Sequence, residues 1–147
     1  MRYLLLAFLA LSFQSVYSAT LDGVPITLPS GGIEDNLMED SLICDSARVL
    51  IDTKETTLMN YATKNISEIT RQIENGNCDV MFSRLQGVVI KRLVRGYLTG
   101  INGELSSEIL LEIEHGGETL GWTESLNVEF ASGMYEDAKK RMDAELQ

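Results

Sequence analysis

The chain has 147 residues and a formal net charge of −10, with 22 acidic residues, 12 basic residues and one histidine. This length suits one domain with its own hydrophobic core. The negative charge argues against binding to nucleic acid or to anionic lipid headgroups, because both are themselves anionic. The charge is compatible with a basic protein partner, a cation, or no more than solubility.

Residues 1–18 have the parts of a secretory signal peptide. Arg2 precedes a short apolar core from Leu4 to Phe13, and small residues stand just before Ala19. The apolar core is too short to span a bilayer as a helix. We therefore predict cleavage before Ala19 and a periplasmic or secreted mature protein with no membrane anchor.

Residues 19–32 differ in composition from the rest of the chain. Apolar residues alternate here with polar residues and prolines, and Pro25 and Pro29 are the only prolines in the sequence. Proline excludes a central strand and favours an extended or edge conformation. The pattern predicts an extended N-terminal arm, which lies across the folded body, docks on a partner by strand addition, or is a poorly ordered tail.

From residue 33 onward, apolar residues recur mainly at intervals of three and four, which is typical of amphipathic helices. The tripeptide Asn75-Gly76-Asn77 ends one run, and Gly116-Gly117 ends another. In the third run, the β-branched cluster Val88-Val89-Ile90 could form a strand instead of a helix, which stays open as an alternative. The runs cover residues 37–51, 58–73, 78–97, 108–114 and 126–146.

These runs predict an all-α fold for residues 33–147: a bundle of four to five helices with the extended arm in front of it. The two cysteines, Cys44 and Cys78, fall on the first and third runs. An even number of cysteines in an oxidising compartment predicts one disulfide, which would tie these two helices together. Two buried free thiols are the alternative.

Few residues in the chain point to reaction chemistry. His115 is the only histidine and precedes two glycines, a position typical of a helix cap rather than a catalytic base. One histidine and two paired cysteines are too few ligands for a tetrahedral zinc site, so we expect no metal and no cofactor. The glutamates from Glu104 to Glu118 lack the spacing of an EF-hand loop and suit a solvated acidic face.

The segment Gly96-Tyr97-Leu98-Thr99-Gly100 carries two glycines four residues apart, a spacing that lets another helix approach closely. Together with the upstream Cys78, this segment resembles small secreted helical proteins of the Tai immunity type, which protect against type VI amidase toxins. It also resembles relatives of the HdeA-type acid-stress chaperones. The resemblance implies a periplasmic, helical binding protein that is not an enzyme.

We therefore expect a small protein-binding module, most concretely an immunity or inhibitor protein whose acidic face covers a basic site on its partner. Tyr97, Trp122 and Tyr135 are candidate anchors, because aromatic residues dominate interface hot spots; each is alternatively a core residue. One alternative function is an acid-stress chaperone whose carboxylates protonate at low pH. Another is a cell-wall hydrolase that uses paired carboxylates.

Overall fold

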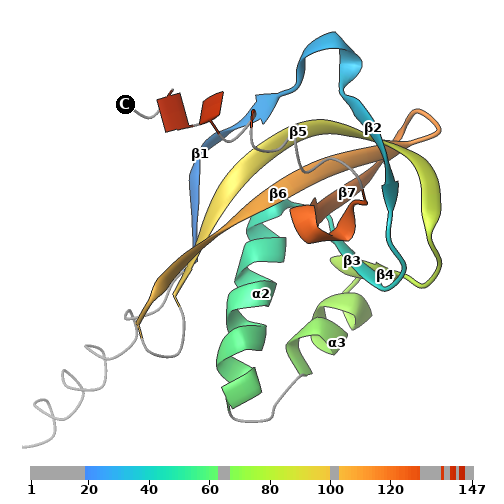
Figure 1. Ribbon diagram of the computed structural model, residues 1–147. Coiled ribbons are helices and arrows are strands. Elements are labelled where there is room, and N and C mark those ends of the chain that lie inside the picture. Colours follow the sequence, from blue (N-terminus) through green and yellow to red (C-terminus); the bar gives the residue numbers. More distant parts are fainter. Residues whose placement is uncertain are drawn as a thin grey trace, which may run out of the picture.

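The computed structural model describes residues 19–62, 67–99 and 103–129, together with Asp137, Lys140, Arg141, Asp143 and Ala144. For residues 57–62 and 67 it describes the backbone alone. Within these residues, seven strands form one antiparallel sheet and two α-helices lie together on one side of it (Figure 1). The elements are β1 (Thr20–Thr27), β2 (Ile33–Leu37), β3 (Ser41–Cys44), α2 (Ala47–Ala62), α3 (Ser67–Glu74), β4 (Cys78–Met81), β5 (Leu85–Thr99), β6 (Leu105–His115) and β7 (Glu118–Glu124).

The sheet has the strand order β1-β5-β6-β7-β3-β4, and β2 also pairs with β5. The long strand β5 carries β2 beside its first half and β1 beside its second half, on the same edge. Both helices are inserted between β3 and β4. The strands β1 and β4 are therefore at opposite ends of the sheet.

The expected all-α bundle is wrong, and so is the helical domain over residues 33–147, because most of the expected helices are strands. The central strand β5 is apolar on both faces: Val94 packs on the α2 side and Leu93 on the other. A run that is apolar on both faces contains residues at helical spacing by necessity, so the interval does not distinguish helix from strand. The strand alternative for residues 88–90 is confirmed.

The segment expected to be a helix at 108–114 is strand β6. Leu111 and Ile113 alternate with Glu112 and Glu114, and alternation is the period of a strand. The glycines Gly116 and Gly117, expected to stop a helix, instead form the two-residue turn between β6 and β7. Both have positive φ (60° and 82°), as a tight hairpin turn requires.

The two helices expected first along the chain are partly helical in the structure. The expected helix at 37–51 contains β3 and only the first residues of α2, which begins at Ala47. The expected helix at 58–73 is divided between α2 and α3. The expected stop at Asn75-Gly76-Asn77 is confirmed: α3 ends at Glu74, and Gly76 has a φ of 76°.

The core has two parts, one on each face of the sheet. On one face, Leu50 and Ile51 of α2 pack against side chains from β5, β6 and β7. A Cβ on Gly96 would lie 2.7 Å from Cδ1 of Ile51, so this glycine lets a helix approach closely, as expected, although it does so from a strand. On the other face, strands β2, β5 and β6 bury a second apolar cluster with Val128.

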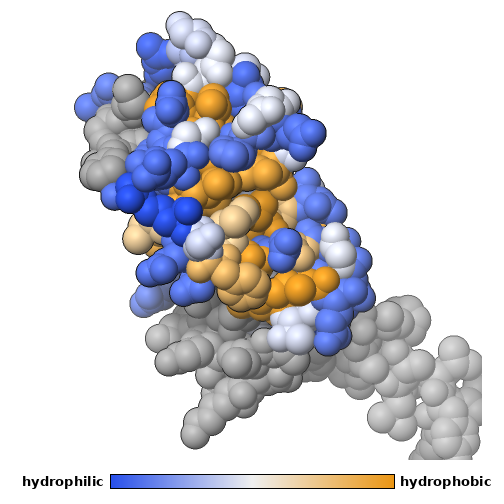
Figure 2. Space-filling model, turned by 90° about the vertical axis from the view of Figure 1, so that its right-hand side faces the viewer, coloured by the Kyte–Doolittle hydropathy of each residue, from blue (hydrophilic) through white to orange (hydrophobic). Residues whose placement is uncertain are grey.

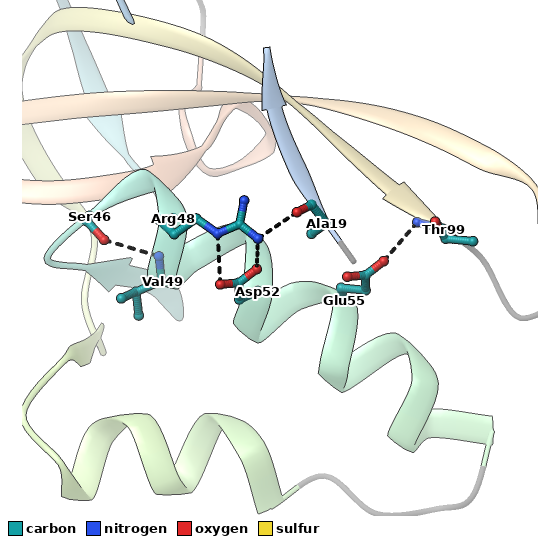
Figure 3. Close-up of polar contacts among 7 residues, drawn as sticks. All are labelled: Ala19, Ser46, Arg48, Val49, Asp52, Glu55 and Thr99. Carbon is teal, nitrogen blue, oxygen red and sulfur yellow. Dashed lines mark hydrogen bonds and ion pairs between the residues drawn. The ribbon is translucent and has the colours of Figure 1, made fainter. Parts of the chain in front are cut away.

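Residues 20–27 are extended and form β1, which belongs to the same sheet as β2. The register of β1 against β5 shifts between Asp22 and Ile26, and Pro25 lies in that irregularity, where a missing N–H costs no ladder hydrogen bond. The carbonyl of Ala19 accepts a hydrogen bond of 2.6 Å from Arg48 of α2 (Figure 3). The start of the described chain is thus fastened to the helix.

The predicted disulfide is confirmed, but it joins two paired strands rather than two helices. Cys44 and Cys78 lie opposite each other on β3 and β4. The predicted signal peptide at 1–18 and the candidate anchor Tyr135 lie outside the described residues. Of the expected helix at 126–146, the residues from 137 onward that the structure describes are helical, and Ser125–Asn127 form a short 3-10 helix.

Candidate protein-binding groove

The two described aromatic candidates lie on opposite faces of the sheet. Trp122 is 5% exposed in the core beneath α2, and the Arg92 guanidinium lies 5.5 Å from the centre of its ring. Tyr97 is half-buried, and its hydroxyl donates a hydrogen bond of 3.1 Å to Asp22 of β1. The structure does not bring them together, and the burial of Trp122 leaves it little surface to offer a partner.

A groove of about 480 Å³ lies where α3, β3, β4 and β7 meet. On the side of the molecule where β3 and β4 lie, hydrophobic residues form a continuous band (Figure 2). The apolar side chains that line the groove are Ile43, Ile73, Val80, Met81 and Leu120.

Two strand edges at this groove have no strand partner among the described residues. The strand β4 is the last in the sheet order, so its outer edge is unpaired. The strand β7 pairs with β3 at one position, Cys44 with Trp122, which leaves the outer edge of Glu118–Leu120 unpaired. An unpaired edge presents main-chain N–H and C=O groups to any chain that lies beside it.

Among the described residues, the charged side chains that line the groove are both acidic. They are Asp45 and Asp79, and no described lysine or arginine lines it. Next to β4, the ring of Phe82 is 80% exposed, the most exposed aromatic side chain in the described part of the chain. The groove is therefore apolar at its base, negative in its charged lining, and flanked by an exposed aromatic ring.

The walls of the groove are held in place by several local contacts. The disulfide fixes β4 to β3, and the amide of Asp45 donates to the carbonyl of Asn77 at 2.9 Å. The Asn77 side chain donates in turn to Gln72 of α3 at 2.8 Å. In α3, hydrogen bonds from Arg71 and Gln72 lower the pKa of Glu68. The groove is thus preformed, which lowers the entropic cost of binding.

A cluster of charged side chains lies beneath α2, and each charge in it is paired with another member of the cluster. Lys54 contacts Glu108 at 2.9 Å and Glu124 at 2.5 Å. Burial would lower the pKa of Lys54, but the hydrogen bonds that Lys54 donates to Glu124 and Glu108 outweigh it, and the pKa is raised. Beside this cluster, both oxygens of Glu112 accept hydrogen bonds from Arg92. These charges satisfy one another, as structural ion pairs do.

Comparison of the chain with family models, with curated proteins and with solved structures finds no match. The resemblance to Tai-type immunity proteins and HdeA-like chaperones therefore stays a prediction. In the described part of the chain, no group of three or more histidine, cysteine or acidic side chains is placed to hold a metal ion. Nor is any described helix long and apolar enough to cross a membrane.

Sequence reasoning missed the groove because its lining comes from four separate elements. The run Asp79-Val80-Met81-Phe82 follows the turn at Gly76, and its short length suits a strand. The sequence thus carried a signal for strand β4. It could not show that Phe82 is exposed, since exposure depends on where the sheet ends.

Proposed function

We propose that this protein is a binding module that holds an extended, basic and apolar segment of a partner protein in the groove beside β4. The observation that carries the proposal is the coincidence of an apolar groove with an unpaired strand edge and two carboxylates, Asp45 and Asp79. A peptide that adds to a sheet edge gains affinity from main-chain hydrogen bonds and specificity from pockets for alternate side chains.

Charge supports a basic partner. The chain carries a net charge of −10, which steers a cationic protein toward it and raises the association rate. The groove adds local selectivity, because an acidic segment would place like charges beside Asp45 and Asp79. An immunity or inhibitor protein that covers a basic site on its target is the concrete form of this proposal, and it acts by binding rather than by catalysis.

The proposal is tested by fluorescence anisotropy with short labelled peptides in which lysine alternates with valine. We expect the lysine–valine peptide to bind, whereas a glutamate–valine peptide does not. A lysine–valine peptide with prolines at alternate positions loses main-chain donors, so its binding should be weaker by about tenfold. The substitution Ile73→Lys places a like charge at the groove and should weaken binding by about tenfold or more.

The matched control is Val24→Lys, which adds the same charge at an 85% exposed apolar residue on β1, at the other end of the sheet. This variant should bind the peptide almost as well as the parent protein. Equal loss of binding in both variants would show that only net charge matters. Unchanged binding of the Ile73→Lys variant would show that the peptide does not occupy the groove.

A further inference from the structure

The backbone of β4 points every second residue's main-chain groups toward its unpaired edge. In an antiparallel pair, residues that exchange no hydrogen bonds across the pair turn their N–H and C=O groups away from each other, and their Cα atoms lie about 4.5 Å apart rather than about 5.5 Å. The Cα atoms of Cys44 and Cys78 are 4.0 Å apart, so this pair is of the closer kind. The main-chain groups of Cys78 therefore point outward from β4, and so do those of Val80, two residues further along.

Contacts on the other side of β3 agree with this alternation. The carbonyl of Leu42, the residue opposite Val80, accepts a hydrogen bond of 2.8 Å from the hydroxyl of Thr123 in β7. The carbonyl of Cys44 also faces β7, since a Cβ on Gly121 would lie 2.5 Å from its oxygen. Both carbonyls thus point away from β4, which leaves the N–H and C=O groups of Val80 at the outer edge of that strand.

The outward N–H of Val80 is covered by a side chain of its own strand. It donates a hydrogen bond of 2.8 Å to Oδ1 of Asp79, the exposed residue before it. Strand β2 has a similar arrangement, in which the N–H of Asn36 donates to Asp35 at 2.7 Å. There the carbonyl of Asn36 is also occupied, by the amide of Glu129 at 3.1 Å. Beside the outer edge of β4, by contrast, no strand lies among the described residues.

A strand that adds to this edge must displace the Asp79 carboxylate from the Val80 N–H. The cost is small, because the contact is exposed and water replaces it. An uncharged strand gives the displaced carboxylate no new partner, whereas a lysine or arginine beside it does, through a stronger, charge-assisted hydrogen bond. A second copy of this chain would bring its own Asp79 to the same edge, so like charges disfavour the pairing of two β4 edges.

We propose, building on the proposed function, that Asp79 determines which segments the groove accepts. It covers the Val80 N–H in the unbound protein and releases it to an extended segment whose lysine or arginine then pairs with the Asp79 carboxylate. The two groove carboxylates therefore have different tasks. Asp79 covers the edge and selects the partner, whereas Asp45, whose main-chain N–H bonds the carbonyl of Asn77 within the sheet, contributes charge alone.

The test compares a lysine–valine peptide with a serine–valine peptide of equal length by fluorescence anisotropy. The substitution Asp79→Ala uncovers the Val80 N–H, so the serine–valine peptide should bind about threefold more tightly than it binds the parent protein. In the same variant, the preference for the lysine–valine peptide should fall by about tenfold. The matched control Asp45→Ala removes an equal charge from the same groove. It should weaken lysine–valine binding by about threefold and leave serine–valine binding unchanged.

A measurement without peptide isolates the covering hydrogen bond. Protection of the Val80 amide from hydrogen exchange, corrected for the intrinsic rate of each sequence, should be lower in Asp79→Ala than in the parent protein and in Asp45→Ala. If the two variants change the binding of both peptides equally, Asp79 acts through charge alone and the proposal is wrong, although the binding function stands. Absence of lysine–valine binding by the parent protein would overturn the binding function itself. Equal protection of Val80 in all three proteins would overturn the role of Asp79 separately.

Discussion

Arg92 and Arg95 lie three residues apart on β5 but face opposite sides of the sheet. On the α2 side, Arg92 gives both hydrogen bonds to Glu112 and lies over the Trp122 ring. On the other side, Arg95 holds Asp143 with one nitrogen and buries two without partners. Breaking a fully paired contact such as Arg92–Glu112 leaves a charge without its partner and is costly, whereas removing the incompletely paired Arg95 also removes two unsatisfied N–H groups.

The largest effect should come from the disulfide, which anchors the strands next to α2. Closing a loop with a sequence separation of 34 stabilises a fold by about 3–4 kcal/mol in the chain-entropy model. Reduction, or replacement of Cys44 and Cys78 by alanine, should lower the free energy of unfolding by about that amount. Urea denaturation with and without reductant measures it. A loss below about 1 kcal/mol would contradict a structural role for this bond.

The next largest effect should come from Lys54 beneath α2. The substitution Lys54→Met leaves Glu108 and Glu124 facing each other, each about one-fifth exposed on the side chain. We expect a loss of roughly 2–3 kcal/mol, less than a fully buried pair would cost. Adding Glu108→Gln and Glu124→Gln to this variant should recover much of that loss, and thermal unfolding of the parent protein, the single variant and the triple variant tests whether it does.

The cluster around Lys54 also makes the stability of the fold depend on pH. The folded-state pKa of Lys54 is raised above 10.5, so the unfolded state loses this proton first as the pH rises. The stability that the cluster contributes is therefore fully present below pH 10.5 and lost as the pH rises through the folded pKa. Unfolding curves above pH 10.5 should show a steeper decline for the parent protein than for the triple variant just described.

The comparison of the two arginines is sharpened by matched substitutions. The substitution Arg92→Met breaks the pair with Glu112 and the contact with Trp122, and should cost about 1–2 kcal/mol. The substitution Arg95→Met removes two unsatisfied N–H groups and frees the half-exposed Asp143, so we expect a change within about 1 kcal/mol, or a gain in stability. Equal losses of unfolding free energy in both variants would mean that Arg95 contributes as much to stability as Arg92.

The smallest effect should come from Glu68 in α3. Hydrogen bonds from Arg71 and Gln72 lower its pKa from 4.5, so its contribution to stability is present above pH 4.5 and is lost as the pH falls through the folded pKa. The variant Glu68→Gln should therefore resemble the parent protein in strong acid and be slightly less stable at neutral pH. An acid titration of the unfolding free energy tests this. A difference that grows toward low pH would contradict it.

Local chemistry predicted part of this structure from sequence, and the rest depended on partners far along the chain. The disulfide, the end of α3 at Gly76 and the extended conformation near Pro25 follow from single residues and their neighbours. The sheet does not, because β5 is buried on both faces and its apolar run fits a helix as well as a strand. The alternation in β6 was a usable strand signal that helix-like spacing obscured.

The candidate sites were harder to predict than the fold. Nothing in the sequence brings Ile73 and Leu120 into one groove, or Asp143 next to Arg95, since these pairs come from separate elements. For Trp122 the sequence left two roles open, because an aromatic residue suits an interface or a core equally well. Only its burial in the structure decides between them.

The most direct test of the proposed binding function is hydrogen exchange of the protein with and without the lysine–valine peptide. We expect the peptide to slow exchange of the main-chain amides of Cys78–Met81, at the unpaired edge of β4, and to leave those of Thr20–Thr27 in β1 unchanged. Protection confined to β1, or to none of the strand edges, would show that the groove beside β4 does not hold the peptide.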